Sequence, residues 1–476
     1  MKKSFTIFTF LLLGIFSFLL CSCTREVNPT QKIKELRFNI TVNNATSTKA
    51  VKSGWENGDK IFVFFSEYLY KEDYVTFTYD ATSGTWTGVS SNDLDEQGED
   101  NLGTSGTMYA ICYPFGDVIV DDEDDYNFTC IYNSTNPALH GMPVLSYSLT
   151  NGTGDPYNID VEGDIATLSG TLNMSIPDNY VQFYIEKSGS LYDQNDKYRL
   201  SVEGVSPVSV TFDFYDEVFQ NVEFGSGQPM WGYKYGDGIV FSGMIDDTWA
   251  NPANNHRMVF FSDGDPAVTK VFSGKTLGSH DAIKLKSPIS GNGWSNYMIA
   301  PSYTEIGGIK WADWYLGCDA PLDIAHKNNL YFRWGDIVPN GSGYCPSKDA
   351  IMNTELSGAF NIYDPARAIL GSNWRMPGNS DYSSLLSGSN LSVAEDEGKS
   401  FVKFSEKAGE KSVIFLSYSA LHDGVGGILF FWTNKSSENE KARAWELNEA
   451  AGGSFQEAAT KGKEQIYIIR PIYIGE

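Results

Sequence analysis

The sequence predicts a mainly β protein, and three observations support this prediction. Residues 36–42 alternate between apolar and polar side chains, as a half-buried strand does, and similar short segments recur about every ten residues. The 46 glycines and the low share of charged residues, 20%, suit a chain rich in turns. No apolar stripe with the helical period is sustained before residue 300.

The expected strands follow one another through the first half of the chain. The continuous apolar run at 61–65 predicts a strand buried on both faces, and the segment 74–79, rich in threonine and aromatic residues, leads into a turn at Ser83-Gly84. Further strands are expected at 108–113, 166–174, 181–186, 198–202, 208–214, 238–242 and 258–261. Short strands separated by turn signals are typical of β-sandwiches.

Length and composition limit the possible functions. A chain of 476 residues that is 41% hydrophobic can bury several cores and is too apolar to remain disordered. The formal net charge of −25 opposes binding to nucleic acid, which requires a basic surface. We therefore expect a folded protein of several modules with no nucleic-acid partner.

The N-terminal segment predicts export and lipid attachment. Lys2 and Lys3 precede an apolar run over 5–20, as in a secretory signal peptide; a short transmembrane anchor is the alternative interpretation. The following residues, Leu20-Cys21-Ser22-Cys23, resemble the lipobox of bacterial lipoproteins. This resemblance implies a signal peptide over 1–22 and acylation of Cys23, for example by palmitate. It also implies a linker over 23–35 and a lipid-anchored, surface-exposed protein on the outer membrane.

The four remaining cysteines leave their pairing open. Cys112 with Cys130, and Cys318 with Cys345, are candidate disulfides outside the cytoplasm, and free buried thiols are the alternative. The absence of a C-x-x-C motif and the presence of only five histidines predict no metal site. The acidic segment 121–125 could bind Ca²⁺, but it lacks the spacing and glycine of an EF-hand loop, which favours a solvated loop.

A change in composition indicates a domain boundary. The first 300 residues carry a net charge of −19 and the remainder −6, whereas six of the eleven tryptophans follow residue 300. The boundary is expected in the segment 287–293, which is rich in glycine and serine.

The first two-thirds of the chain contain an ordered set of short motifs. These are Thr48-Lys49-Ala50, Gly54 to Val63, Tyr109 to Pro114, Gly141-Met142-Pro143 and Lys275-Thr276-Leu277. Together they resemble the fimbrillin-like proteins of Bacteroides-type bacteria. The resemblance implies two tandem β-sandwiches, at 36–165 and 166–295, in an accessory or tip-like pilus subunit. Within the second motif, Asn57-Gly58-Asp59 predicts a tight turn that needs a residue tolerating positive φ.

The last third contains a second ordered set of motifs. These are Trp311 to Gly317, Tyr331 to Gly335, Tyr363 to Ala366, Asn373 to Pro377, Phe431 to Thr433, Ala444 to Leu447 and Ile469 to Ile472. They resemble the domain named for the Fibrobacter succinogenes major paralogous family. The resemblance implies an α+β domain at 296–476, related to C-type lectins and found on bacterial surface proteins. A short helix ending near residue 386 is expected, capped by Asn379 or Ser380.

Two residues of the last third are candidate ligand-binding residues. Trp374 and Arg375 could bind a sugar or a carboxylate, because aromatic faces and guanidinium groups suit such ligands. The alternative is that they serve the core and the strand pairing of the fold, and Trp334 and Trp432 are expected in the core. No nucleophile elbow or zinc-helix motif is present, so the sequence predicts no catalytic residues and no cofactor.

These observations predict a non-enzymatic surface lipoprotein that mediates adhesion through its C-terminal domain. The expected partners are pilin subunits, bound by strand addition, and a glycan or host surface protein. A stand-alone glycan-binding lipoprotein is the alternative, and a lipid-anchored enzyme acting on polysaccharide is a less favoured one.

Overall fold

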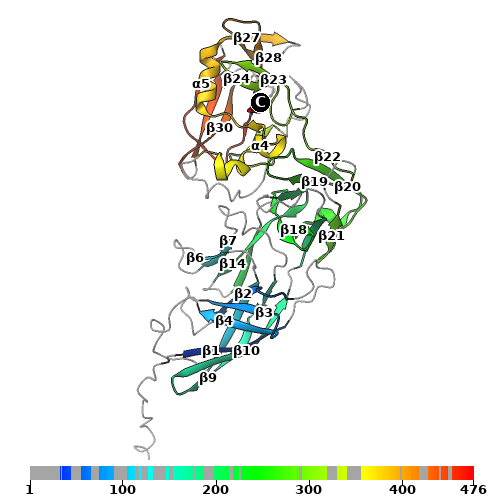
Figure 1. The fold of residues 1–476 in the computed structure, drawn as a ribbon, viewed down its shortest axis with the longest axis vertical. Helices are drawn as coiled ribbons and strands as arrows, with labels where there is room; N and C mark the ends of the chain where they lie inside the picture. The colour runs from blue at the N-terminus through cyan, green and yellow to red at the C-terminus, as the bar shows by residue number, and fades with distance from the viewer. Residues whose placement is uncertain are drawn as a thin grey trace, which may run out of the picture. The chain divides into compact units, whose positions relative to one another are not determined.

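The computed structural model describes most of the chain from residue 33 onward, and its strands are shown in Figure 1. The described residues are 33, 35–43, 55–65, 74–90, 104–112, 117–120, 127–131, 146–148, 154–175, 178–186, 198–213, 218–223, 227–286, 288, 292–318, 330–339, 355–396, 399–416, 427–438, 441–448 and 453–475. The chain forms two compact units. Unit 1 comprises 1–43, 56–110 and 148–174, and unit 2 comprises 44–55, 111–147 and 175–476.

The first sheet has eight strands in the order β1-β10-β8-β5-β2-β3-β4, and β9 pairs with both β10 and β5. The pairing of β1 with β10 is parallel, whereas β9 pairs antiparallel with both of its neighbours. The bounds are β1 Glu35–Asn43, β2 Lys60–Phe65, β3 Val75–Asp80, β4 Thr85–Ser90, β5 Ser105–Cys112, β8 Ser146–Ser148, β9 Asp155–Glu162 and β10 Ile165–Ser175.

The core of unit 1 is built from the apolar run of β2. All of its residues from Ile61 to Phe65 are buried, so the expectation of a strand covered on both faces is confirmed. Phe38 of β1 packs against Phe65 and Phe77, with ring centroids 5.9 and 5.5 Å apart. Because β1 also lies beside β4, at the far end of the pairing order, the sheet folds over onto itself.

The predicted tight turn lies immediately before β2. Gly58 has a φ of +89°, which favours glycine, and the backbone N–H of Asp59 donates to the carbonyl oxygen of Glu56 at 3.0 Å. The side chain of Asp59 accepts a hydrogen bond from the Glu56 N–H at 2.8 Å. Gly58 then donates to the carbonyl oxygen of Tyr79 at 2.8 Å, which extends the pairing between β2 and β3.

Unit 2 begins with two sheets around a shared core, in the orders β13-β18-β11-β21 and β16-β12-β19-β20-β22. Buried apolar residues of both sheets, such as Phe183, Leu200, Phe241 and Phe260, form this core. The bounds are β11 Tyr180–Glu186, β12 Arg199–Val202, β13 Val205–Ser206, β16 Met230–Trp231, β17 Tyr233–Tyr235, β18 Gly238–Ile245, β19 Asn255–Phe261, β20 Val268–Ser273, β21 Ala282–Leu285 and β22 Ser295–Asn296. β17 pairs with β18.

A third sheet in unit 2 joins segments that are distant in the sequence, in the order β15-β14-β7-β6. The bounds are β6 Asp117–Val120, β7 Asn127–Ile131, β14 Val208–Asp213 and β15 Val218–Glu223. All the strands that the sequence predicts between residues 36 and 261 are present, so the mainly β prediction is confirmed. In addition, the structure contains strands that the sequence did not indicate, among them β9 and β15.

The described residues after 300 combine three sheets with two α-helices. The sheet orders are β23-β24-β35-β26, β25-β34-β30-β31-β32 and β27-β28-β29, and β33 pairs with β31. The bounds are β23 Tyr303–Ile306, β24 Ile309–Ala312, β25 Tyr331–Phe332, η4 Gly358–Tyr363, α4 Pro365–Leu370, β26 Trp374–Arg375, α5 Asn379–Gly388, β27 Ser389–Asp396, β28 Lys399–Glu406, β29 Ser412–Leu416, β30 Ile428–Glu438, β31 Lys441–Asn448, β32 Ser454–Glu457, β33 Lys461–Gly462, β34 Tyr467–Ile468 and β35 Ile472–Tyr473. In Figure 1, α5 lies against β24 and β30.

Helix α5 begins at Asn379, but the expected cap was wrong. The N-cap is Gly378, whose extended backbone precedes the first helical residue. The Gly378 N–H donates to the carboxylate of Asp381 at 2.6 Å, so the side chain three residues into the helix supplies the reciprocal bond of a capping box. Asn379 instead uses its side-chain amide for contacts with Trp445 and Glu457.

The β19–β20 connection packs against α4. The N–H of Ala267 donates to the carbonyl oxygen of Ile369 at 3.0 Å, and Arg367 forms an ion pair with Asp263 at 3.1 Å. Phe261 and Ala267 belong to the same buried core as Ile369. Residues on both sides of the segment 287–293 therefore share a core, and a domain boundary in that segment stays a prediction.

Within the described part of the chain, no helix is both long enough and apolar enough to span a membrane.

Candidate functional site

Trp374 lies on β26 and is buried, with 4% of its surface exposed. β26 pairs antiparallel with β35, which places Trp374 directly opposite Tyr473. The two rings meet edge to face, with centroids 5.2 Å apart and an interplanar angle of 69°. The structure therefore places Trp374 in the buried core, where the half-buried Tyr473 packs against it.

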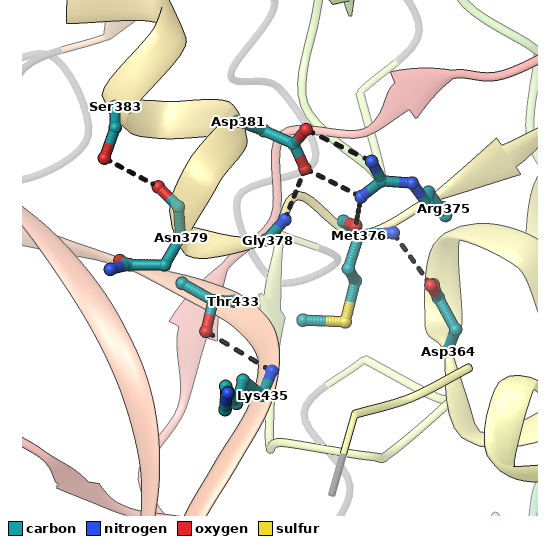
Figure 2. A network of polar contacts seen from close by, with 9 residues as sticks. All are labelled: Asp364, Arg375, Met376, Gly378, Asn379, Asp381, Ser383, Thr433 and Lys435. Carbon is teal, nitrogen blue, oxygen red and sulfur yellow. Dashed lines mark hydrogen bonds and ion pairs between the residues drawn. The ribbon is translucent and has the colours of Figure 1, made fainter.

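Arg375, the other candidate ligand-binding residue, is engaged in a bidentate ion pair. Its Nη1 donates to Oδ2 of Asp381 at 2.7 Å and its Nη2 donates to Oδ1 at 3.1 Å (Figure 2). Nη1 also donates to the carbonyl oxygen of Met376 at 2.9 Å. Such paired bonds fix both distance and orientation, so the ion pair ties the start of α5 to β26.

Asp364 is a fully buried carboxylate between α4 and the segment that follows β26. Oδ1 accepts hydrogen bonds from the N–H groups of Ala366 and Arg367 at 2.9 and 3.2 Å, which caps α4. Oδ2 accepts from the N–H of Met376 at 2.8 Å (Figure 2). Burial raises the pKa of Asp364 to about 6, although these three N–H donors and the nearby Arg375 favour the charged form.

Asn379 connects α5 to the neighbouring sheet. Its Nδ2 donates to Oε2 of Glu457 at 3.1 Å, and its Oδ1 accepts a hydrogen bond from Nε1 of Trp445. Arg443 donates to the other carboxylate oxygen of Glu457 at 2.5 Å. On the helix itself, Ser383 donates to the carbonyl oxygen of Asn379 at 3.0 Å (Figure 2). The side chains of Asn379, Glu457 and Arg443 therefore stabilise the packing of α5 against β31 and β32.

Trp334 and Trp432 are fully buried, so the expectation that they belong to the core is confirmed. Trp334 Nε1 donates to the carbonyl oxygen of Thr433, and Trp432 Nε1 donates to that of Phe332, both at 2.8 Å. The indole of each tryptophan therefore donates to a backbone carbonyl within two residues of the other tryptophan.

A group of three exposed or half-buried residues, missed by the sequence reasoning, lies on the sheet β23-β24-β35-β26. Tyr303 and Tyr473 stack with ring centroids 4.7 Å apart and an interplanar angle of 9°. The ammonium group of Lys310 lies 5.4 and 5.3 Å from the two ring centroids. We call Tyr303, Lys310 and Tyr473 the tyrosine–lysine patch. Only the pairing register brings them together, because Tyr303 and Tyr473 lie far apart in the sequence.

The remaining candidate residues stay predictions. Cys23 and Cys345 lie outside the described residues, as does the acidic segment 121–125. Cys112 ends β5 and Cys130 lies in β7, and only their backbone is described. Cys318 is buried within the core that also contains Trp311 and Tyr315. Among the described residues, no group of three His, Cys, Asp or Glu side chains could hold a metal ion.

Comparisons with known proteins find similarity to solved structures at low sequence identity. No protein-family model matches the sequence, and the search of curated proteins finds no match either. A candidate cell adhesion protein from Bacteroides ovatus is 12% identical, with 53% of this chain and 92% of that chain covered and a TM-score of 0.29. Another from Bacteroides uniformis is 12% identical, with 56% and 96% covered and a TM-score of 0.28. A fimbrial protein from Bacteroides ovatus is 12% identical, with 94% and 99% covered and a TM-score of 0.20.

At these identities and TM-scores the similarity carries no argument about function.

Proposed function

We propose that the chain is a surface-exposed lipoprotein of the outer membrane that serves as an accessory or tip-like pilus subunit. In this proposal, Cys23 carries the lipid anchor, and the α+β residues 296–476, similar to a C-type-lectin domain, mediate adhesion. The lipobox and the two ordered sets of motifs support the assignment. The proposal includes no catalytic step.

The structural observation that carries the proposal is the position of β1 in its sheet. β1 ends the pairing order and runs parallel to β10, with Glu35 opposite Ile165 and Asn43 opposite Asn173. Its main chain therefore supplies a continuous row of hydrogen-bonding groups to one neighbour. In strand addition, such main-chain bonds provide the affinity between subunits.

The side chains of β1 alternate as strand addition requires. Leu36, Phe38, Ile40 and Val42 are half-buried or buried, and the residues between them are exposed. Pockets for alternate side chains provide the specificity of strand addition. We infer that a strand of similar pattern from a pilin subunit can replace β1 in this position.

A disulfide between β1 and β10 tests this function directly. Asn43 and Asn173 lie opposite each other, and their exposed side chains form a hydrogen bond of 2.8 Å. The double variant Asn43→Cys with Asn173→Cys should form a disulfide on oxidation that retains β1. We expect the oxidised protein to lose incorporation into pili and co-purification with pilin, and reduction to restore both.

The single variant Asn43→Cys is the matched control and should be incorporated as the unmodified protein is. If the oxidised double variant enters pili as well as the reduced form does, exchange of β1 is not the means of assembly. The proposal would then be abandoned in favour of the second candidate.

The second candidate is a stand-alone glycan-binding lipoprotein, and the tyrosine–lysine patch favours it. In that case, pilin does not co-purify with any form of the protein, and the oxidised double variant binds glycans as the reduced form does.

A further inference from the structure

A row of three aromatic rings in mutual contact leads from the core of unit 2 to its surface. Trp374 is buried and packs edge to face against Tyr473, and Tyr473 stacks in parallel on Tyr303. The three rings come from β26, β35 and β23, and Tyr303 is 43% exposed. Since β23 ends the order of its sheet, the stack reaches the surface at an edge strand.

The same face of the sheet presents a positive charge beside the rings. Lys310 lies directly opposite Tyr473 in the pairing of β24 with β35, so the two side chains share a face. Its ammonium donates one hydrogen bond, to the carbonyl oxygen of Gly475 at 3.0 Å, and lies within cation–π range of both tyrosine rings.

Among the described residues, no ion pair joins Lys310 to an acid. Glu305 lies opposite Lys310 in the pairing of β23 with β24, yet none of the ion pairs among the described residues joins the two. An ammonium group offers three donors, and only one of them is used here. Although the net charge of −25 repels anions at long range, the ammonium group of Lys310 gives this surface a local positive charge that can contact a negatively charged group.

We propose that the tyrosine–lysine patch binds a carboxylated sugar residue of a surface glycan, such as a uronic or sialic acid. The apolar C–H face of the sugar ring packs on the exposed surface of Tyr303 and extends the aromatic stack. The carboxylate of the sugar accepts a hydrogen bond from the ammonium of Lys310. This inference rests on the proposed adhesive function, because it names the ligand class that the C-terminal residues bind.

The shape of the patch favours a sugar over an acidic peptide. A parallel tyrosine pair offers a flat apolar surface next to a charged group, and a carboxylated sugar ring combines a flat apolar face with an acid on one rigid scaffold. Holding both groups in a fixed geometry limits the entropy lost on binding.

The test uses the full-length protein on an array of carboxylated and neutral glycans, followed by measurement of Kd for the strongest ligand. We expect binding to carboxylated glycans that weakens as salt is added. Tyr303→Ala should weaken binding about tenfold, whereas Tyr303→Phe should retain it because the ring remains. Lys310→Met should weaken binding of carboxylated glycans about tenfold and remove most of the salt dependence, whereas Lys310→Arg should retain both.

A second lysine of similar environment provides the matched control. The ammonium of Lys461 lies 4.2 Å from the ring centroid of Phe430, and Lys461→Met should leave glycan binding unchanged. Far-ultraviolet circular dichroism and thermal unfolding check that each variant is folded.

The possible outcomes separate this inference from the proposed function. If the unmodified protein binds carboxylated glycans but Tyr303→Ala and Lys310→Met bind equally well, the site is wrong and the adhesive function stands. If it binds only neutral glycans, the ligand class is wrong. If it binds no glycan but enters pili, the inference fails while the pilus role stands, and failure in both assays overturns both.

Discussion

Trp249 and His256 stack face to face, with ring centroids 3.8 Å apart and planes inclined by 10°. Both residues are buried, and both ring N–H groups are directed to one acceptor, the carbonyl oxygen of Glu203. The distances from this oxygen are 2.9 Å to Trp249 Nε1 and 3.2 Å to His256 Nδ1. The stack therefore joins the 3-10 helix Asp247–Ala250 to β19 and to the turn after β12.

Removing the stacked imidazole should destabilise unit 2. His256→Ala leaves a cavity against Trp249 and removes one hydrogen bond, so we expect a loss of about 2–4 kcal/mol in the free energy of unfolding. Urea denaturation followed by tryptophan fluorescence measures this loss. His256→Phe keeps a stacked ring and should cost less; an equal loss in both variants would show that the stack contributes little.

Replacement of the Asp364 carboxylate by an amide should destabilise the protein. Both carboxylate oxygens accept N–H donors, whereas asparagine has one acceptor and would direct its NH₂ group at a donor. Asp364→Asn is expected to lower the free energy of unfolding by about 1–3 kcal/mol at neutral pH. The exposed Asp265 serves as the control, since Asp265→Asn should change stability little. Equal stability of the two variants would contradict the prediction.

The raised pKa of Asp364 predicts a pH dependence with a definite sign. Because burial raises its pKa from 3.8 to about 6, the folded state favours the protonated carboxyl. This contribution to stability is fully present below about pH 4 and is lost as the pH rises through 6, by up to about 3 kcal/mol. The difference in unfolding free energy between the unmodified protein and Asp364→Asn should therefore shrink between pH 4 and pH 7. A difference that stays constant over this range would show that Asp364 has an ordinary pKa.

The ion pair of Arg375 should depend on its bidentate geometry. Arg375→Lys keeps the charge but can form only one strong bond to Asp381, and Arg375→Ala leaves a mostly buried carboxylate without its cation. We expect losses of about 1 kcal/mol for lysine and about 2–3 kcal/mol for alanine in thermal or urea unfolding. If lysine behaves as arginine does, the second hydrogen bond contributes nothing.

A charge placed in the shared core should affect both sides of the segment 287–293. Ala267 is buried among residues from before and after this segment, so Ala267→Asp should destabilise unit 2 by more than about 3 kcal/mol. Hydrogen exchange should show reduced protection in β19 as well as in α4. Ala458→Asp is the matched control at a half-buried position and should cost less; loss of protection on one side only would show that the two sides unfold separately.

Local signals in the sequence predicted the strands well. The run at 61–65 is a buried strand because every side chain in it is apolar, whatever its partner. At 181–186, four of the six side chains are apolar, and the strand is buried except at two of its last three residues. The alternation at 36–42 correctly predicted which residues of β1 face inward. It could not predict the parallel pairing with β10, because the period of a strand identifies its faces and not its neighbour.

The site residues were harder to predict, because their surroundings depend on contacts between segments that are distant in the sequence. The core roles of Trp334 and Trp432 follow from their size and apolarity. By contrast, Asp364 and Asp381 are acids that a sequence assigns to the surface. Their burial is explained by the backbone N–H groups that converge on them and, for Asp381, by the ion pair with Arg375. Asp364 did carry a local signal, since an aspartate followed by proline is typical of a helix start. The tyrosine–lysine patch had none, because strand register alone assembles it.

The parallel direction of β1 has a mechanical consequence. Tension between the N-terminus and the C-terminal residues would pull on β1 at Glu35 and on β10 at its opposite end, Ser175. In this geometry the two strands are loaded in shear, so their main-chain bonds share the force instead of breaking one by one. Under the proposed adhesive role, this pair of strands would therefore bear the force applied between the N-terminus and the C-terminal residues.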